Sequence, residues 1–252
     1  MEQENDLTQH DLETAFRELG LREGLPVEVH SSLSSFGRVA GGAETVIAAL
    51  MAVVGQSGTI VMSAYPVSKV LPLTAEDKAN GLTCKVSIFP EHARVASGMG
   101  VIADTFRQRP DVVVGRGIHR VAAWGKDAQV YAEQGYEHLL AVQGYGLLLG
   151  VDINRLSSMH SVEHCVPAAF WERFQLPADI VEKYPPDRWY VEAGNQTEAS
   201  GWNKIQAEAF RQNMIHERMI GKGRCLFFKA GDVVGLYREA LLRDPDGLFG
   251  LL

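Results

Sequence analysis

The stretch LPVEVHSSLSSFGRVAGGAETVIAALMAVVGQSGTIVMSAY, residues 25–65, constrains the fold more than any other part of the chain. Residues 25–30 and 58–65 have the apolar composition of buried strands. Between them, residues 43–55 have the periodicity of an amphipathic helix, which Gly55 would end. A strand, a helix and a strand in this order predict a βαβ unit, with a parallel strand pair and a right-handed crossover.

The rest of the chain continues this alternation, which is typical of an α/β protein. Further helices are predicted at residues 8–20, 98–110, 127–135 and 157–166, within 201–223 and at the end of 224–244. Further strands are predicted at residues 120–125, 144–153 and 188–194 and at the start of 224–244. Residues 66–97 contain three prolines and no clear period, so they are expected to be an irregular, functional loop region. The length of 252 residues fits a single domain over 1–252.

Composition narrows the class of protein. Hydrophobic residues make up 46% and charged residues 22% of the chain, which is typical of a globular protein. The net charge of −7 argues against nucleic-acid binding and mildly favours cationic small substrates. The three cysteines, Cys84, Cys165 and Cys225, are scattered and odd in number, as in reduced compartments. Neither a secretion signal nor an apolar stretch of about 20 residues is present. We therefore expect a cytoplasmic protein without membrane contact.

The segment MHSVEH, residues 159–164, is the strongest local candidate for chemistry. His160, Glu163 and His164 have the H-x-x-E-H spacing of one group of zinc hydrolases, in which both histidines bind the metal. Zinc would need a third ligand, and no spacing singles one out among Glu217, Glu239 and His216. Alternatively, Glu163 orients His160 as a metal-free general base, because residues three apart share a helix face. An ordinary polar helix face is the third interpretation.

Two other segments carry candidate site residues. The Ser/Gly loop at residues 31–42 follows a strand and leads into a helix, so its backbone N–H groups could hold a phosphate, a carbonyl or a pantetheine amide. A plain connection is the alternative. His119 lies at the start of a predicted strand, near Arg116 and Arg120, and is either a second site histidine or simply exposed.

Four blocks of the sequence resemble the aminoglycoside 3-N-acetyltransferase family. The first, residues 29–65, has the V-H-x-S-L, Gly-Gly-Ala and V-G-x-x-G-T elements of that family, and the second is GMGVIADTFRQRP followed by Arg116 and His119. The third is LLLGVDINRLSSMHSVEH and the fourth is RCLFFKAGDVVGLYREAL. Departures from the family pattern, such as Arg120 in place of proline and MSAYP at residues 62–66, concentrate near the expected acceptor side.

The resemblance implies a three-layer α/β/α sandwich around a mostly parallel sheet, and transfer of acetyl from acetyl-CoA to an amine. It implies no metal and leaves His164 a bystander. The catalytic residues implied are His160, Glu163, Asn154 and His119. The residues implied to bind the cofactor are Ser31, Ser32, Leu33, Ser34, Phe36, Gly41, Ser63 and Ser157, and those implied to contact the substrate are Tyr65 and Glu163.

The partners expected from the resemblance are coenzyme A and a cationic amine such as an aminoglycoside, acetylated at its 3-amino group, with the protein a monomer or homodimer. His160 would take the proton of the attacking amine, and Glu163 would orient the ring. One alternative is a CoA-binding protein of this fold with another acceptor or lost turnover. The other is a zinc hydrolase that uses His160, Glu163 and His164.

Overall fold

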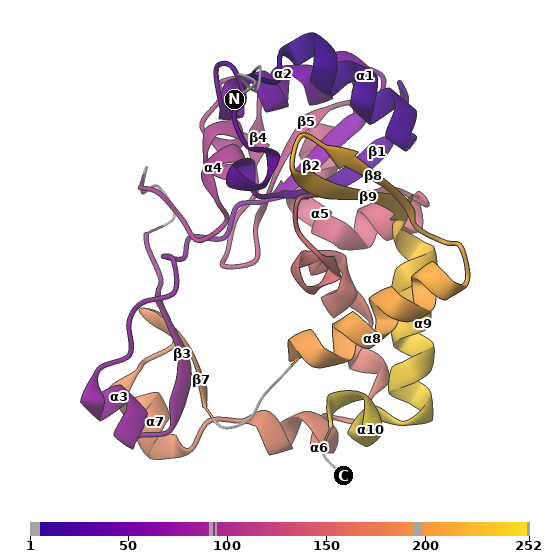
Figure 1. Cartoon of the computed structure of the whole chain (residues 1–252). Coiled ribbons are helices and arrows are strands. Elements are labelled where there is room, and N and C mark those ends of the chain that lie inside the picture. The colour runs from indigo at the N-terminus through magenta and orange to yellow at the C-terminus, as the bar shows by residue number, and fades with distance from the viewer. Residues whose placement is uncertain (1–5, 91–92, 94, 194–197, 251–252) are drawn as a thin grey trace, which may run out of the picture.

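The fold is built on one seven-stranded sheet with helices on both faces (Figure 1). The structure is a computed structural model and describes residues 6–90, 93, 95–193 and 198–250. The strand order is β4–β5–β2–β1–β6–β9–β8. The strands are β1 (Pro26–Ser31), β2 (Thr59–Ser63), β4 (Val113–Val114), β5 (Val121–Gly125), β6 (Tyr145–Leu149), β8 (His216–Ile220) and β9 (Gly223–Lys229).

The three central strands pair in parallel, whereas the strand pairs at the flanks are antiparallel. Strand β1 pairs in parallel with both β2 and β6, and helix α2 (Ala43–Val54) connects β1 to β2, which confirms the predicted βαβ unit. The pairs β2–β5, β4–β5, β6–β9 and β8–β9 are antiparallel. The α/β/α class is therefore confirmed, but the expectation of a mostly parallel sheet is wrong outside the centre. One reason is the tight β8–β9 hairpin, where Gly221 has a φ of 57°.

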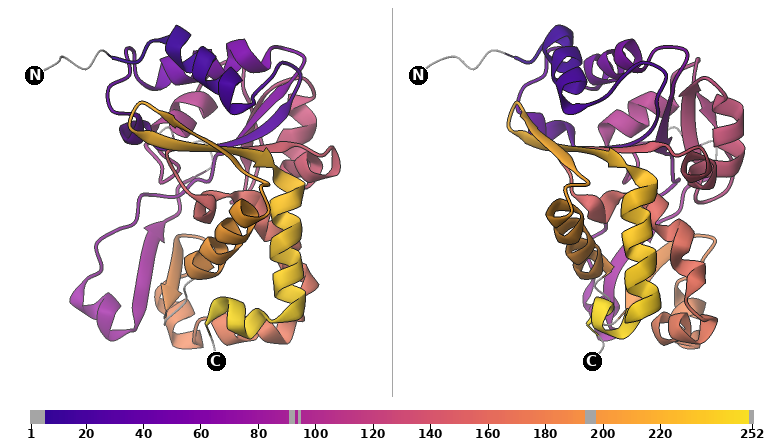
Figure 2. Two further views of the ribbon diagram at one scale, coloured as in Figure 1. Left: turned by 45° about the vertical axis from the view of Figure 1, so that its right-hand side comes forward. Right: turned by 90° about the vertical axis from the view of Figure 1, so that its right-hand side faces the viewer.

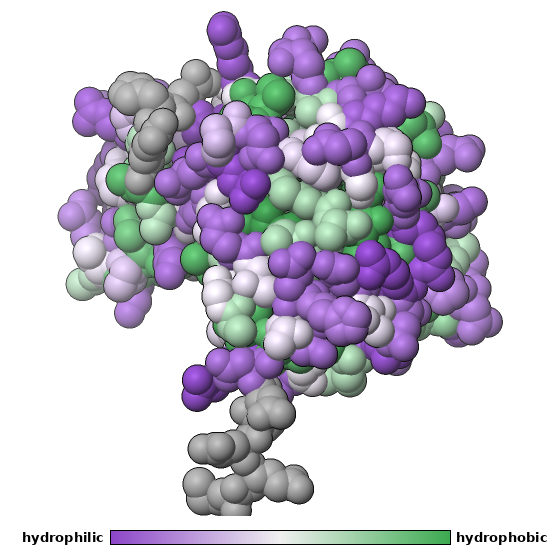
Figure 3. Space-filling model, turned by 90° about the horizontal axis from the view of Figure 1, so that it is seen from above, coloured by the Kyte–Doolittle hydropathy of each residue, from purple (hydrophilic) through white to green (hydrophobic). Residues whose placement is uncertain are grey.

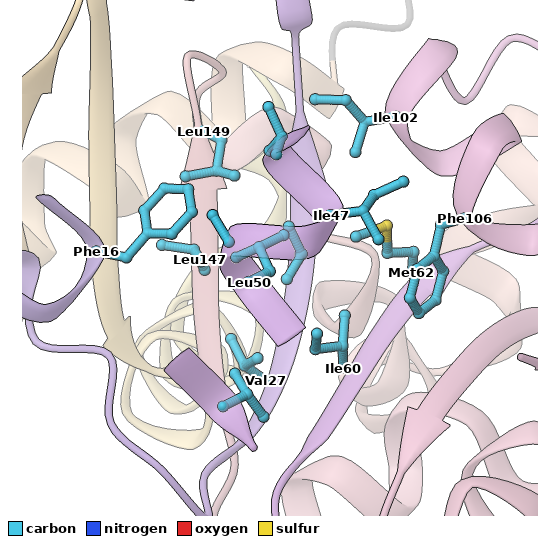
Figure 4. Packing of buried hydrophobic residues seen from close by; sticks show 14 of the residues in the cluster. Phe16, Val27, Ile47, Leu50, Ile60, Met62, Ile102, Phe106, Leu147 and Leu149 are labelled. Carbon is cyan, nitrogen blue, oxygen red and sulfur yellow. The ribbon is translucent and has the colours of Figure 1, made fainter. Parts of the chain in front are cut away.

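One face of the sheet packs against α1 (Gln9–Leu19), α2 and α4 (Val101–Arg107). Figure 4 shows apolar side chains of these helices, including Phe16, Ile47 and Phe106, against those of the central strands. Burial of each such side chain contributes about 1.5–3 kcal/mol. Helix α1 begins at a capping box in which the Thr8 N–H donates to Asp11 over 2.9 Å. The outer surface above this layer is mainly hydrophilic (Figure 3).

The opposite face packs against longer helices from the second half of the chain. They are α5 (Ala128–Ala141), α8 (Glu198–Arg211), α9 (Ala230–Arg243) and α10 (Pro245–Phe249), with the 3₁₀ helix η3 (Ser157–Cys165) between them and the sheet. Helix α5 is longer than the helix predicted at residues 127–135. The chain kinks at Gly135, where φ is 62°, and then continues as a helix. No helix in the described ranges is both long and apolar enough to span a bilayer.

A second, two-stranded sheet lies apart from the central one (Figures 1 and 2). It pairs β3 (Leu82–Ser87) with β7 (Trp189–Ala193) and packs with α3 (Ala75–Ala79) and α7 (Ala178–Lys183). The prediction that residues 66–97 are irregular is therefore wrong for α3 and β3. The partner of β3 lies about a hundred residues later in the chain, so no local pattern indicates the pairing. Residue 194, at the end of the strand predicted at 188–194, lies outside the described residues.

Short elements complete the chain. They are the 3₁₀ helices η1 (Leu33–Phe36), η2 (Ile153–Arg155) and η4 (Glu172–Phe174), and the α-helical turn α6 (Ala168–Trp171).

The small sheet is held by a buried charge network around Asp77. The Lys85 ammonium donates to both carboxylate oxygens of Asp77, over 2.7 and 2.8 Å, and the Tyr184 hydroxyl donates over 2.6 Å. The Thr74 N–H donates to the same carboxylate over 2.8 Å. The hydrogen bond from Lys85 and then that from Tyr184 lower the pKa of Asp77 well below its usual range.

We expect Asp77→Asn to loosen the small sheet, because a neutral amide cannot offset the buried Lys85 charge. Since folding lowers the pKa of Asp77, its contribution is complete above the unfolded pKa of about 3.9 and is lost as the pH falls below that value. Hydrogen exchange at pH 7 should show reduced protection of residues 82–87 and 189–193. Asp179→Asn, which changes an exposed carboxylate on α7, is the control. Equal protection in both variants would contradict this role.

Candidate active site

A cavity of about 1400 Å³ opens where the three parallel strands end. The carboxyl ends of β1, β2 and β6 meet at one edge of the sheet, which is where ligands bind in open α/β sheets. Of the residues singled out from the sequence, the following border it: Ser31, Ser32, Leu33, Ser34, Ser63, Tyr65, Asn154, Ser157 and His160. Residues scattered over 130 positions of sequence are thus brought to one cavity.

His160 and Glu163 form a hydrogen-bonded pair on the wall of this cavity. The Nδ1 atom of His160 lies 2.9 Å from Oε1 of Glu163, and the His160 side chain is half exposed. The buried Tyr237 hydroxyl donates to the same Glu163 oxygen over 3.3 Å. The Trp202 ring and the imidazole pack in a T-shaped arrangement, with ring centroids 4.9 Å apart. The ring is therefore held through Nδ1.

The helix that carries this pair is a 3₁₀ helix, whereas the sequence predicted an ordinary helix. Residues three apart eclipse each other in a 3₁₀ helix, so His160 and Glu163 share one face. His164, four positions after His160, is rotated away by about 120°. The zinc arrangement needs both histidines on one face. Among the described residues, no three His, Cys, Asp or Glu side chains gather in a metal-binding group.

The loop after β1 turns into the 3₁₀ helix η1 along the cavity. The Ser32 N–H donates to the Leu149 carbonyl over 2.9 Å, and the Ser35 hydroxyl donates to the Ser32 carbonyl over 2.6 Å. Gly150 has a φ of 70°, and a Cβ there would lie 1.6 Å from the Ser35 hydroxyl oxygen. Only glycine therefore fits beside this loop. The first N–H groups of η1, on Leu33 and Ser34, lie at a helix start, where intrahelical partners are lacking.

A cluster of hydroxyl groups forms the floor of the cavity. The Ser63 hydroxyl lies 3.0 Å from that of Ser157 and 2.7 Å from that of Tyr136. Tyr65 borders the same cavity, and burial raises the pKa of its hydroxyl. Burial, followed by the charge of Glu28, raises the pKa of Tyr136 well above its usual value. These phenols therefore stay protonated near neutral pH and act as neutral hydrogen-bonding groups.

Three further predicted site residues do not border the cavity, and Glu163 reaches it only through His160. His119 lies behind Tyr65, with ring centroids 5.4 Å apart, and partial burial and then the charge of nearby His160 lower its pKa. Phe36 is 1% exposed and packs in the core. Gly41, with a φ of 78°, lies in the turn before α2. Neither Phe36 nor Gly41 is placed for a side-chain contact with a ligand in the cavity.

The cysteines have no place in this site. Cys225 is buried on β9, where burial raises the pKa of its thiol to about 12. Burial also raises the pKa of Cys84, on β3 of the small sheet. These two thiols are protonated near neutral pH, as expected of packing residues.

The sequence analysis missed residues that the structure brings to the cavity or beneath it. Trp202 comes from α8, about 40 residues after His160, and no local pattern indicates it. His30 borders the cavity, and Glu28 lies fully buried beside it. A signal for this pair was available, because two polar residues at positions i and i+2 of an apolar strand point to the same face.

Comparisons with known proteins identify the family of the chain. The family model described as aminoglycoside 3-N-acetyltransferase matches residues 29–241. The chain is 32% identical over 181 residues to the SPbeta prophage-derived aminoglycoside N(3')-acetyltransferase-like protein YokD of Bacillus subtilis strain 168, covering 64% of this chain and 66% of that protein. It is 30% identical over 190 residues to aminoglycoside N(3)-acetyltransferase III of a Salmonella species, covering 68% and 65%. The matches thus span slightly less than two thirds of each relative.

Solved structures share the fold over nearly the whole chain. The apoenzyme of aminoglycoside acetyltransferase AAC(3)-IVa superposes with a TM-score of 0.71 at 19% identity, covering 99% of this chain and 93% of that chain. The YokD protein from Bacillus subtilis gives 0.70 at 24%, covering 96% of each chain, and AAC-IIIb, a binary complex with CoASH, gives 0.69 at 19%, covering 97% and 98%. The matched family segment runs from β1 into α9 and includes all the cavity strands. The chain belongs to the aminoglycoside 3-N-acetyltransferase family.

Proposed function

We propose that the protein is an acetyl-CoA-dependent N-acetyltransferase that acetylates an amine of an aminoglycoside, at the 3-amino group by analogy with its family. The observation that carries the proposal is the His160–Glu163 pair, joined over 2.9 Å, on the wall of the cavity that the Ser31–Ser34 loop also borders. As proposed, a single domain works as a cytoplasmic monomer or homodimer. Acetyl-CoA is its co-substrate, and the reaction uses no metal.

Coenzyme A would bind along the Ser31–Ser34 loop, with Ser63 and Ser157 beside the thioester. Two observations support this assignment. The Leu33 and Ser34 N–H groups lie at the start of η1, where helix partners are lacking, so they are available to a carbonyl oxygen. AAC-IIIb, which was solved as a binary complex with CoASH, has the same fold as this chain.

The reaction needs a neutral amine, because an ammonium ion is not a nucleophile. The Nε2 atom of His160 takes the proton of the attacking amine, while Glu163 holds Nδ1 and offsets the charge that develops on the ring. The amine nitrogen bonds to the thioester carbon, and the N–H groups of the loop or the Ser157 hydroxyl stabilise the oxyanion. The carbon–sulfur bond then breaks and CoA leaves. Asn154 and His119 are assigned to the catalytic residues, and Tyr65 and Glu163 are assigned to contacts with the substrate.

One observation favours a second candidate, a CoA-binding protein of this fold with another acceptor or lost turnover. An aminoglycoside is polycationic, but the two carboxylates that border the cavity in the described part of the chain already have cationic partners. Glu44 lies 3.1 Å from Arg109, and Asp104 lies 2.9 Å from Arg107. The aminoglycoside proposal is retained because relatives are named for that activity, and because sisomicin-bound AAC-VIa has the same fold.

His160→Ala should lower kcat by at least about 100-fold, the contribution of a general base, while the Kd of CoA changes little. Release of CoA thiol from acetyl-CoA with a panel of aminoglycosides measures kcat, and calorimetry measures CoA binding. His164→Ala is the matched control, since this histidine lies off the shared face of η3. Loss of CoA binding in His160→Ala would make His160 a pocket residue. An unchanged kcat in His160→Ala would contradict the metal-free pair. A large fall in kcat in His164→Ala that added zinc restores would contradict it as well.

Gly150→Ala should weaken CoA binding roughly tenfold, equivalent to about 1.4 kcal/mol, because the new methyl group would displace Ser35 and with it the loop. The control is Gly81→Ala. Gly81 also has a positive φ, 76°, but a Cβ there meets open space in the turn before β3, far along the chain from the loop. Calorimetry with CoA compares the two variants. Equal affinities in Gly150→Ala and the wild type would remove this loop from the CoA site.

A further inference from the structure

A second histidine–carboxylate pair lies at the base of the same cavity and is not used in the reaction described above. His30 Nε2 lies 2.7 Å from Oε1 of Glu28, and both side chains project from the same face of β1. Glu28 is 0% exposed, whereas His30 borders the cavity. A carboxylate buried in the middle of a sheet is costly, so a purely structural role explains it poorly.

The pair is held firmly from the side of η3. The Ser158 N–H donates to Oε1 of Glu28 over 3.1 Å, and the Ser157 N–H donates to Nε2 of His30 over 3.4 Å. The other carboxylate oxygen, Oε2, is buried and has no hydrogen-bond partner among the described residues. One ring nitrogen of His30 is thus fixed by Glu28. The other, Nδ1, makes no hydrogen bond with the described residues.

The contacts of the pair leave one ring atom of His30 for a ligand. Nε2 lies against Oε1 of Glu28 and accepts from the Ser157 N–H. His30 borders the cavity, so Nδ1 is the ring atom through which it would donate to a bound ligand.

The two histidines flank the place where a thioester would react. His30 immediately precedes the Ser31–Ser34 loop and adjoins Ser157, the first residue of η3. His160 lies one 3₁₀ turn further along η3, about 6 Å of helix rise, on the same face as Ser157. If the thioester carbonyl carbon is bound between the two histidines, His160 lies on the side from which the amine attacks. His30 then lies on the side of the Ser31–Ser34 loop, where the sulfur of a bound CoA would lie.

We propose that His30 is a second catalytic residue, which protonates the departing sulfur, and that Glu28 is its positioning residue. This inference rests on the proposed acetyl transfer. As the carbon–sulfur bond of the tetrahedral intermediate breaks, its electron pair goes to sulfur and the Nδ1 proton of His30 follows, which gives the free thiol of CoA. His160 has meanwhile taken a proton from the amine. His160 releases that proton to solvent through the cavity, and His30 regains one.

The test compares His30→Gln and Glu28→Gln with the wild type, using two acetyl donors and one aminoglycoside acceptor. With acetyl-CoA, His30→Gln should lower kcat about 100-fold, and the Kd of CoA should change less than about twofold. With 4-nitrothiophenyl acetate, whose thiolate leaves without a proton, the same variant should react at a rate close to that of the wild type. His160→Ala should be impaired with both donors, because it acts on the amine.

Glu28→Gln separates positioning from structural support. The amide keeps a polar group beside Nε2 of His30 but removes the buried carboxyl group, so kcat should fall less than in His30→Gln while Tm does not fall. A fall in Tm that accompanies the fall in kcat would make the pair structural. Unchanged kcat in His30→Gln, an equal loss with both donors, or a CoA affinity that falls as much as kcat would overturn the assignment of His30. Wild-type protein that releases no thiol with any acceptor would instead overturn the proposed function itself.

Discussion

The position of β1 between two parallel partners is the constraint on which the rest of the structure depends. It pairs in parallel with β2 on one side and with β6 on the other, so all three strands run in one direction and end at one edge. The chain leaves each strand there, and each exit contributes to the cavity. The serine loop follows β1, Ser63 ends β2, and η2 and η3 follow β6. Strands β5 and β9, on either side of this group, run in the opposite direction and add no exit at this edge.

The 3₁₀ conformation of η3 decides what the H-x-x-E-H motif can do. With three residues per turn, the helix aligns Ser157, His160 and Glu163 and turns His164 away. In an α-helix the two histidines would lie on one face, and the same H-x-x-E-H motif would then suit a metal. The tighter helix instead suits an imidazole that is held by one carboxylate, with Tyr237 and Trp202 fixing the pair from α9 and α8.

Charge in the cavity is arranged in local pairs. Glu163 is matched by His160, Glu28 by His30 and Glu44 by Arg109. Such pairing lowers the cost of placing carboxylates in a partly buried site, and it lets each one orient a neighbouring donor. It also leaves little unpaired negative charge on the described walls to attract a polycation.

The sequence by itself determined the features that depend on neighbours within about ten residues. The capping box at Thr8, helix α2, the βαβ unit and the proximity of His160 to Glu163 all follow from short-range periodicity. Only the tertiary structure decided the direction of β5 and β9, the pairing of β3 with β7, and the packing of Trp202 against His160. These features depend on contacts between residues some 40 to 110 positions apart, and no local pattern encodes such contacts. Glu28 lies between these cases, since its strand was predicted, but its burial beside His30 depends on β2, β6 and η3 closing around it.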